Sequence, residues 1–493
     1  MLQPVRGPYP EVVHPPDPLV VGFDLDMTLI DTRPGFAATL DVLGEETGVA
    51  MDVEGMSARL GPPLSHLLEP YFAADRIDDL VDRFRVHYAG VAVTPTPALP
   101  GAHDALAAVR RHGGRTVLVT GKFAPNARLH VDHLGLDVDV LEGEVWGVGK
   151  ASALTGHGAS VYVGDHVHDV EGALAAGALS VSVLTGGCSA EELREAGTHV
   201  VLEDLTAFPA WLDAHVLGLR LAALEDRLRE LGPVLVAFSG GADSAFLLAA
   251  AVRALGADKV GAATAYSDSL PQAERSPASD FADALGVRVF TPETHEMDRE
   301  GYRANAGDRC YFCKAELLDT LGPIAAREGF AAVATGTNAD DAVAGFRPGI
   351  RAADERGAVT PLKDAGFTKE QVRAASRAWD LPTWDKPAAA CLSSRVAYGI
   401  AVSPYRLARV ERTEVAVRAA LTDAGLAVQN LRVRDLGDRA SVEVDTALVA
   451  AASALPSVVA AAVAAGFPEA VVDPKGFRSG SMNEALPDPE RFR

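Results

Sequence analysis

The chain has 493 residues and a formal net charge of −22, and 48% of its residues are hydrophobic. At about 150 residues per domain, this length predicts about three globular units with real cores. Nucleic acids and anionic membranes both require a basic face, so the charge disfavours non-specific binding to either. No apolar run of about 18 residues predicts a membrane span, and the N-terminus has no signal-peptide core. We expect a cytoplasmic protein.

Four cysteines, Cys188, Cys310, Cys313 and Cys391, are too few for a disulfide framework. In a reducing compartment, cysteines are more often metal ligands or catalysts than covalent cross-links. Cys188 is best explained as a small apolar filler.

Residues 1–18 are rich in proline and predict a flexible tail. Residues 19–209 alternate short apolar runs with helical patterns, as in LVVGFDLD, RTVLVTGK, VYVGDHVHD and ALSVSVLTG. Such runs are typical of buried parallel strands, with helices crossing between them. Residues 34–97 interrupt this rhythm with mostly helical sequence, which predicts an inserted cap.

A linker over 210–218 is expected to lead into a second alternating unit over 219–402. Its expected strands are PVLVAFSG, KVGAATAYS, VRVFTPE and AAVATGTN. Residues 403–493 then read as a long helix, two strands, an alanine-rich helix over 447–465 and a last strand. The predicted fold class is therefore α/β, with two Rossmann-like parallel-sheet domains and a small C-terminal α+β domain.

The first strand runs into Asp24, Asp26 and Thr28, which form a DxDxT pattern. Two aspartates two residues apart at a strand end can point to the same side of the sheet, so one can attack phosphorus while the other moves a proton. A DxD pattern alone is weak, because it also occurs in caps and turns. Four further polar residues follow at or near later strand ends: Thr120, Lys150, Asp165 and Asp169.

In this order the motifs resemble the haloacid dehalogenase (HAD) superfamily over residues 19–209, and the helical insert resembles the cap of its phosphoglycolate phosphatase subgroup. The resemblance implies that Asp24 is the nucleophile and Asp26 the acid/base. Thr120 and Lys150 would hold the phosphoryl oxygens. Asp24, Asp165 and Asp169 would bind Mg²⁺, which prefers carboxylate oxygens. The alternative is a decayed domain that is kept as a scaffold.

A second constellation stands between strand VLVAF and an apolar helix, and its residues are Ser239, Gly240, Gly241, Asp243 and Ser244. A glycine pair lets the backbone approach a phosphate, and the following helix N-terminus offers free N–H groups. The sequence has no GxxxxGK[ST] segment, so this is not a Walker loop. SGGxDS instead resembles the PP-loop of enzymes that split ATP into AMP and pyrophosphate before nitrogen or sulfur displaces the AMP.

Cys310 and Cys313 form a CxxC pair, and Cys391 stands far away in KPAAACLSSR. Three thiolates are one ligand short of a tetrahedral zinc site, but they suit an iron–sulfur cluster with one open iron. An incidental or redox role for the CxxC pair stays open. Lys386 and Arg395 stand near Cys391 in the sequence and are candidates for lowering the pKa of its thiol.

The segments RCYFCK, GTNADD, RPG, WDKP, ACLSSR and GFRSGSMN together resemble the LarE family from about Leu219 to Asn483. Members of this family insert sulfur into pyridinium-3,5-biscarboxylic acid mononucleotide during synthesis of the nickel-pincer cofactor. The resemblance implies that ATP adenylates a substrate carboxylate and that Cys391 takes part in sulfur delivery. In one branch this cysteine is sacrificed and becomes dehydroalanine. In the other branch, three cysteines hold a four-iron four-sulfur cluster, and this chain has all three.

A substrate with phosphate and carboxylates needs cations, and arginine forks match both groups. The candidate substrate-binding residues are Lys314, Arg395, Arg432, Arg434, Arg478, Ser479, Gly480 and Ser481. Arg432 and Arg434 alternate on one strand and should point to one side, although edge-strand surface arginines would look the same. Glu414 and Glu443 are weaker candidates for binding Mg²⁺ or the ribose.

Two other functions remain open from the sequence. The first is tRNA 2-thiolation by a PP-loop enzyme, which the charge of −22 disfavours because RNA needs a basic face. The second is a nucleotide sensor with an inactive HAD scaffold. The expected partner is the pyridinium mononucleotide, with no nucleic acid and no membrane, and the LarE resemblance implies a homo-oligomer.

Overall fold

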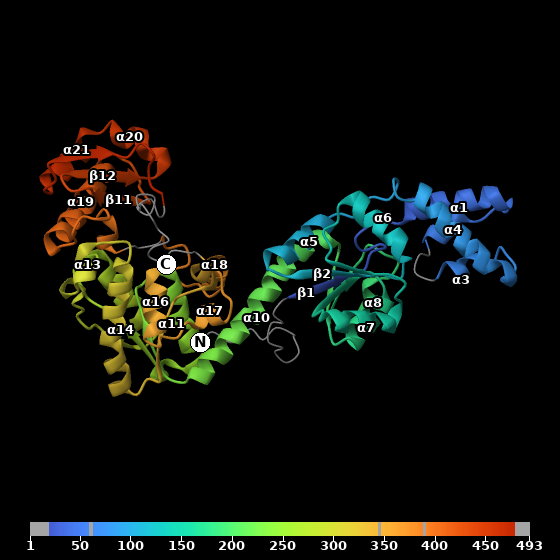
Figure 1. Ribbon diagram of the computed structural model, residues 1–493, viewed down its shortest axis with the longest axis horizontal. Coiled ribbons are helices and arrows are strands. Elements are labelled where there is room, and N and C mark those ends of the chain that lie inside the picture. Colours follow the sequence, from blue (N-terminus) through green and yellow to red (C-terminus); the bar gives the residue numbers. More distant parts are fainter. Residues whose placement is uncertain (1–18, 59–62, 344–346, 388–390, 479–493) are drawn as a thin grey trace. The chain divides into compact units, whose positions relative to one another are not determined.

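The computed structural model describes residues 19–58, 63–343, 347–387 and 391–478 (Figure 1). The chain divides into two compact units, Met1–Leu219 and Arg220–Arg493. Residues 210–218, expected to form a linker, lie inside helix α10 (Phe208–Leu231). A single 24-residue helix therefore continues through the division instead of an irregular segment.

The first unit is built on a parallel six-stranded sheet with the order β3-β2-β1-β4-β5-β6. The chain moves outward from β1 in one direction and then from β4 in the other, so the strand order reverses between these two neighbours. Open α/β sheets place ligands outside the carboxyl ends of the strands at such a reversal. The strands are β1 (Val20–Phe23), β2 (Arg115–Val119), β3 (Val140–Glu142), β4 (Val161–Gly164), β5 (Leu179–Val183) and β6 (Val200–Leu202).

Helices cover this sheet, and its apolar strand residues Val21, Phe23 and Val163 are fully buried in the core. Apart from α10, the helices of this layer are α5 (Ala102–Arg111), α6 (Ala124–Leu134), α7 (Lys150–His157), α8 (Val167–Ala175) and α9 (Ala190–Glu195).

The insert after β1 is helical, as predicted. It has its own core, in which Phe36 and Leu40 of one helix pack with Phe84 and Tyr88 of another. Figure 1 shows these cap helices in blue. They are α1 (Arg33–Thr47), α2 (Val53–Ala58), α3 (Leu64–Leu68) and α4 (Ile77–Val91).

The second unit contains a parallel four-stranded sheet with the order β10-β7-β8-β9. Here the order reverses between β7 and β10. The strands are β7 (Val234–Ala237), β8 (Val260–Ala263), β9 (Arg288–Phe290) and β10 (Ala332–Thr335). The helices are α11 (Ala242–Leu255), α12 (Arg275–Ala284), α13 (Glu300–Ala304), α14 (Arg309–Glu328), α15 (Ala339–Val343), α16 (Pro348–Glu355), α17 (Pro361–Asp364) and α18 (Lys369–Ala378).

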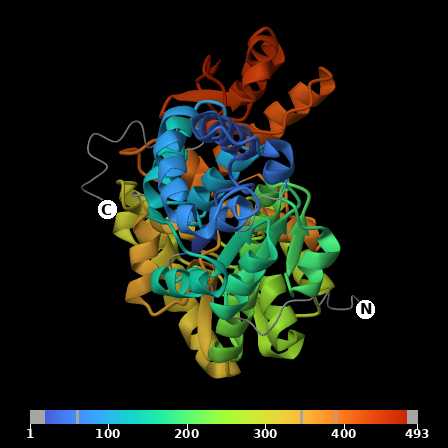
Figure 2. The ribbon, with the colours of Figure 1, turned by 90° about the vertical axis from the view of Figure 1, so that its right-hand side faces the viewer.

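The C-terminal domain has three strands, with β11 antiparallel and β13 parallel to β12. Figure 2 shows it in orange to red as a lobe of helices and strands. Its elements are α19 (Pro404–Asp423), β11 (Leu431–Asp435), β12 (Arg439–Val444), α20 (Val449–Ser453), α21 (Pro456–Ala464) and β13 (Glu469–Val472). The predicted fold class, two parallel sheets followed by a small α+β domain, is confirmed.

The alanine-rich stretch 447–465 was predicted as one helix, and this was wrong. It forms α20 and α21, because Pro456 cannot continue the ladder of α20 and instead begins α21. Among the described residues, no single helix is long and apolar enough to cross a membrane. The pair Thr446–Ser453 and Pro456–Ala464 reaches that length and composition only when the two helices, bent by 85°, are taken together.

Candidate functional site

Three carboxylates gather where the strand order of the first sheet reverses. Asp24 follows β1, Asp165 follows β4, and Asp169 lies in the first turn of α8. One oxygen from each lies within 4.8 Å of the others, and all three side chains are buried. Because Mg²⁺ binds carboxylate oxygens at about 2.1 Å, a group of this size and chemistry fits the ion.

Lys150 balances this negative charge. Its Nζ donates hydrogen bonds to Asp24 Oδ1 at 2.7 Å, to Asp169 Oδ1 at 2.6 Å and to the Tyr162 hydroxyl at 2.8 Å. The Tyr162 hydroxyl in turn donates to the carbonyl of Val119 at 2.7 Å. Burial alone would lower the pKa of Lys150, but Asp169 and Asp24 outweigh it and raise that pKa well above its ordinary value. The ammonium is therefore fixed and charged beside the expected nucleophile.

Burial, together with the neighbouring carboxylates Asp169 and Asp26, raises the pKa of Asp24 to about 7, although Lys150 opposes the shift. Burial and then Asp169 likewise raise the pKa of Asp165, whose Oδ1 accepts a hydrogen bond from Thr28 Oγ1 at 2.9 Å. A bound divalent cation would favour the charged forms of both groups. Only glycine fits beside Asp165 at position 186, because a Cβ there would lie 1.8 Å from the Asp165 Oδ2 atom.

Asp26 is held by a residue that was missed from the sequence. The Nζ of Lys122 donates to Asp26 Oδ1 at 2.7 Å, and the Thr32 hydroxyl donates to the same oxygen. Burial would raise the pKa of Asp26, but Lys122 and then Thr32 outweigh it, so the pKa is lowered. Between the two aspartates and Thr28, Met27 adopts a left-handed φ of 58°. Lys122 could have been identified from the sequence, because it ends the TGK segment two residues after Thr120.

The cap reaches this group through Tyr88 of α4. Lys122 Nζ lies 4.6 Å from the centroid of the Tyr88 ring, and the Tyr88 hydroxyl is 2.8 Å from His130 Nε2. Tyr88 and His130 are both buried. Thr120 is also buried, and its Oγ1 accepts the backbone N–H of Lys122 at 3.2 Å. A cap side chain therefore contacts the cation that binds the expected acid/base.

The second site begins at the reversal between β7 and β10. The predicted PP-loop, Ser239–Ser244, connects β7 to α11, and Gly240 has a φ of 71° that favours glycine. The hydroxyls of Ser239 and Ser244 are 3.1 Å apart. Asp243 accepts a hydrogen bond from Asn338 Nδ2, which follows β10, at 3.2 Å. The free N–H groups at the start of α11 suit a phosphate.

Lys386 contacts this loop. Its Nζ donates to the Gly240 carbonyl at 2.9 Å and to Glu274 Oε2 at 2.6 Å. Lys386 was expected to act on Cys391, but these contacts place it against the PP-loop, where it can meet a nucleotide phosphate. The expected effect of Lys386 on the Cys391 thiol stays a prediction.

The cysteine group is assembled from two segments. Cys310 and Cys313 lie in the first turn of α14, and Cys391 precedes a short 3₁₀ turn, Leu392–Arg395, with its Sγ 3.0 Å from Ser393 Oγ. Burial and then the nearby Cys391 raise the pKa of Cys313 well above its ordinary value. Among the described residues, only the group of Asp24, Asp165 and Asp169 has three ligand atoms within 4.8 Å of one another. The three sulfurs are therefore not gathered around a single-ion position.

Arginines connect the Cys391 turn to strand β11. Arg395 donates to the Cys391 carbonyl at 3.0 Å, and its Nε pairs with Glu414 Oε1 at 3.0 Å. Arg434 donates to the Ser394 carbonyl at 3.1 Å and pairs with Glu443 Oε2 at 2.8 Å. Glu414 and Glu443, expected to bind Mg²⁺ or ribose, thus both pair with arginines.

Arg432 lies beside these pairs, with its guanidinium 5.6 Å from the centroid of the Phe477 ring. Burial, and then the neighbouring Arg395, lower the pKa of Arg432 to about 10. Since like charges crowd here, the cluster favours an anionic ligand.

The remaining candidates are placed as follows. Burial lowers the pKa of Lys314, which lies next to Cys313 on α14. Arg478 contacts its own turn, donating to the Gly476 carbonyl at 3.3 Å and lying 4.0 Å from Asp473 Oδ1. Ser479, Gly480 and Ser481 lie outside the described residues.

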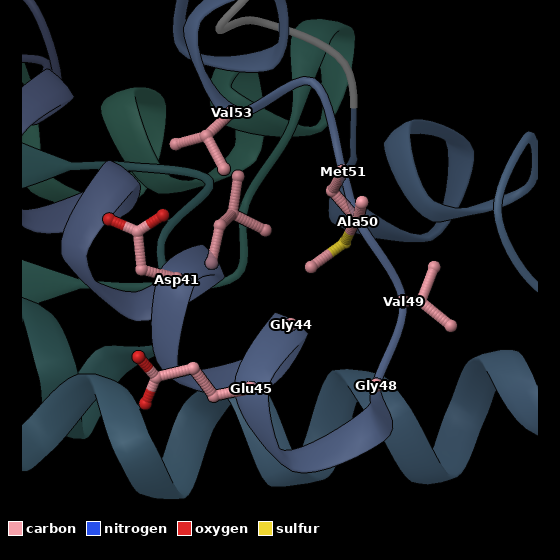
Figure 3. A pocket seen from close by; sticks show the side chains of 9 residues that line it. Asp41, Gly44, Glu45, Gly48, Val49, Ala50, Met51 and Val53 are labelled. Carbon is pink, nitrogen blue, oxygen red and sulfur yellow. The ribbon is translucent and has the colours of Figure 1, made fainter.

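A depression of about 330 Å³ lies on the cap, between α1 and the start of α2 (Figure 3). Its labelled side chains include Asp41, Glu45, Met51 and Val53. None of the residues named in the two sites above lines it. It lacks a cluster of ligand atoms and carries no functional assignment.

The chain is similar to two different groups of known proteins. A family model for haloacid dehalogenase-like hydrolases matches residues 21–174, and a second HAD-hydrolase-like model matches residues 150–208. Tyrosine-protein kinase PtkA of Mycobacterium tuberculosis is 26% identical over 203 residues, covering 38% of this chain and 70% of that protein. The first unit therefore contains a HAD domain.

Two relatives match the other part. An uncharacterised Synechocystis protein is 37% identical over 274 residues, covering 55% of this chain and 99% of that protein. Pyridinium-3,5-bisthiocarboxylic acid mononucleotide synthase of Lactiplantibacillus plantarum is 33% identical over 271 residues, covering 55% of this chain and 96% of that enzyme. The chain belongs to the LarE family. It is a LarE-type protein with a HAD domain fused in front of it, as predicted.

Proposed function

We propose that the LarE-type unit is an ATP-dependent sulfur transferase that acts on pyridinium-3,5-biscarboxylic acid mononucleotide. The observation that supports it best is the pair of hydrogen bonds from Arg395 and Arg434 to the carbonyls of Cys391 and Ser394. The Arg434 bond joins strand β11 to the turn that follows Cys391, and the Arg395 bond closes that turn on the Cys391 carbonyl. The name of the L. plantarum relative gives the class of product, a pyridinium bisthiocarboxylic acid mononucleotide.

The chemistry has two steps. A substrate carboxylate oxygen attacks the α-phosphorus of ATP, the bond to the β-phosphate oxygen breaks, and pyrophosphate leaves. The PP-loop amides and Lys386 would bind the departing phosphates. A sulfur nucleophile then attacks the acyl carbon, and AMP leaves with the carboxylate oxygen. Pyrophosphate release that depends on the pyridinium substrate, with a gain of sulfur in place of oxygen in the product mass, tests this function.

The sulfur atom comes either from Cys391 itself or from sulfide on a cluster. We favour a four-iron four-sulfur cluster held by Cys310, Cys313 and Cys391, because the hydrogen bond from Arg309 to the Ser393 carbonyl joins the helix that carries the CxxC pair to the turn that follows Cys391. When bound, such a cluster with an open iron would carry the extra sulfide. Anaerobic purification, an iron assay and an absorption spectrum test this choice, and iron-free protein that is fully active refutes it.

The HAD domain is proposed to be a Mg²⁺-dependent phosphohydrolase, and the buried group of Asp24, Asp165 and Asp169 supports this best. Asp24 would attack phosphorus, Lys150 would hold a phosphoryl oxygen, and Asp26 would protonate the leaving group and then activate water. Because one relative is named a tyrosine kinase, the assay should also offer ATP with a tyrosine-containing copolymer. Label that passes to tyrosine, without release of phosphate, would reject hydrolysis.

Fusion suggests that both units serve one pathway. We propose that the phosphatase acts on a phosphorylated precursor, by-product or damaged form of the pyridinium mononucleotide. Screening nucleotide monophosphates and sugar phosphates tests this, and a strong preference for phosphoglycolate would indicate a housekeeping role instead.

We also propose that the protein is a cytoplasmic homo-oligomer that binds neither nucleic acid nor membrane. Light scattering with and without tRNA tests both the oligomeric state and the tRNA alternative.

A further inference from the structure

Arg309, the first residue of α14, stands immediately before Cys310 and is only 4% exposed. Its Nη1 donates hydrogen bonds to the Ser393 carbonyl at 2.8 Å and to Asn305 Oδ1. Its guanidinium also lies 5.5 Å from the centroid of the Tyr398 ring. Arg309 thus contacts the turn that follows Cys391 while being attached to the helix that carries the other two cysteines.

Asn305 extends this connection. It is fully buried with a left-handed φ of 52°, and its Nδ2 donates to the carbonyls of Ala397 and Ile400, both at 2.8 Å. Its own carbonyl accepts the Gly399 N–H at 3.1 Å. Since buried carbonyls need donors, these two side chains help to hold the segment from Ser393 to Ile400 on the α14 side, while Asp435 of β11 accepts the Ala397 N–H on the other side.

The charge of Arg309 is unusual for its burial. Within the described part of the chain, it forms no ion pair with Asp or Glu, and its oxygen acceptors are an amide and a backbone carbonyl. A buried cation costs several kcal/mol unless negative charge lies nearby. Cys310 is the next residue along α14, and Cys391 lies two residues before Ser393, whose carbonyl accepts the Arg309 hydrogen bond. The buried positive charge therefore lies beside the residues that carry the sulfur atoms.

We propose that Arg309 is a positioning residue for sulfur transfer, which holds the Cys391 turn against the Cys310–Cys313 helix and places positive charge beside the sulfur centre. The proposal deepens the sulfur-transfer function and rests on it for its catalytic meaning. The claim that Arg309 holds the Cys391 turn against α14 does not depend on that function, because it concerns only the distance between two segments of the chain.

The geometric part is tested with dibromobimane, which fluoresces when it bridges two neighbouring thiols. In full-length protein carrying Cys188→Ser and Cys310→Ser, Cys313 and Cys391 are the remaining thiols. Arg309→Gln should slow their bridging about tenfold. Arg309→Lys should slow it less, because the ammonium keeps the charge and several donors, although its shorter side chain lacks the planar fork of arginine. Arg327→Gln, at the exposed end of the same helix, is the matched control and should not change the rate.

The functional part uses protein with all its cysteines. Arg309→Gln should reduce thiocarboxylate formation at least tenfold while substrate-dependent pyrophosphate release stays within twofold, and Arg309→Lys should recover part of the loss. Equal losses in both assays would show a merely structural arginine and overturn the proposal, as would unchanged bridging. If Arg309→Gln fails to fold, Arg309→Lys is the deciding variant. Its bridging rate should fall at least threefold, and an unchanged rate would overturn the proposal. A parent protein that makes no thiocarboxylate refutes the transferase function alone, since bridging still reports the position of Cys391.

Discussion

In the HAD domain, the reactive carboxylates lie at the ends of two adjacent strands of one parallel sheet or on the helix that follows, and Lys150 forms ion pairs with two of them. In the LarE-type unit, the reactive groups come from the PP-loop, the start of α14, the Cys391 turn and strand β11. The first site is held by a single sheet. The second depends on side chains such as Arg309, Arg395 and Arg434 that join separate segments. A site on one sheet should therefore lose activity mainly through its reacting groups and less through supporting residues, whereas a site made from several segments should be strongly sensitive to the residues that connect them.

The largest effect is expected from Asp24→Asn, which keeps the side-chain shape and removes the nucleophile. Hydrolysis of p-nitrophenyl phosphate should fall by about 10³-fold or more. Asp132→Asn, an exposed position on α6, is the matched control. Sulfur transfer should be unchanged, which would sharpen the separation of the two sites. A variant as fast as the parent refutes the assigned nucleophile.

Cys391→Ala should reduce the rate of sulfur transfer by about 100-fold or more. Pyrophosphate release should stay measurable, because the thiol acts only after adenylation. Intact-protein mass spectrometry separates the two sulfur sources. Sacrifice of Cys391 removes H₂S, about 34 Da, and leaves dehydroalanine. A loss of 34 Da in iron-free protein would exclude the cluster, and activity that survives in Cys391→Ala would exclude both sources.

Cys310→Ser tests whether the CxxC pair belongs to the same centre. It should reduce bound iron to below about a tenth of the parent value and prevent multiple turnovers, because a two-thiolate site cannot retain the cluster. Cys188→Ser, in the HAD domain, is the control and should keep iron and activity. Full iron content in Cys310→Ser would mean that the cysteines do not act together.

Lys386→Met tests the contact between Lys386 and the PP-loop. Because a charge-assisted hydrogen bond contributes about 1.5–3 kcal/mol, the KM for ATP should rise about 10- to 100-fold. The exposed Lys259→Met is the matched control. An unchanged KM would assign Lys386 to structure alone, through its ion pair with Glu274.

The smallest effect concerns the contact between cap and HAD site. Lys122→Met removes the hydrogen bond that orients the Asp26 carboxyl. Hydrolysis of alkyl phosphates, whose leaving groups need a well-placed proton donor, should therefore slow about tenfold, although loss of the cation by itself would raise the pKa of Asp26. p-Nitrophenyl phosphate, with a good leaving group, should slow only about two- to threefold. Arg128→Met, exposed on α6, is the control. Equal losses on both substrates would contradict a role for Lys122 through Asp26.

Local sequence determined much of this protein. Apolar strand runs and the order of polar residues at their ends predicted both parallel sheets, because each feature depends on neighbours within a few residues. The DxDxT, GDHVHD and SGGADS segments could be recognised for the same reason. Pro456 was equally visible, and the prediction of one alanine-rich helix failed because its effect on the helix ladder was overlooked.

Only the tertiary structure decided which distant residues meet. Lys122 contacts Asp26 across 96 positions, Lys386 reaches Gly240 across 146, and Arg309 reaches Ser393 across 84. Nothing in a run of adjacent residues encodes such pairs, since they follow from strand order and from the packing of helices on the sheets. Burial, likewise a property of the folded chain, raises the pKa of Asp24 and encloses the Arg309 guanidinium beside the Cys391 turn.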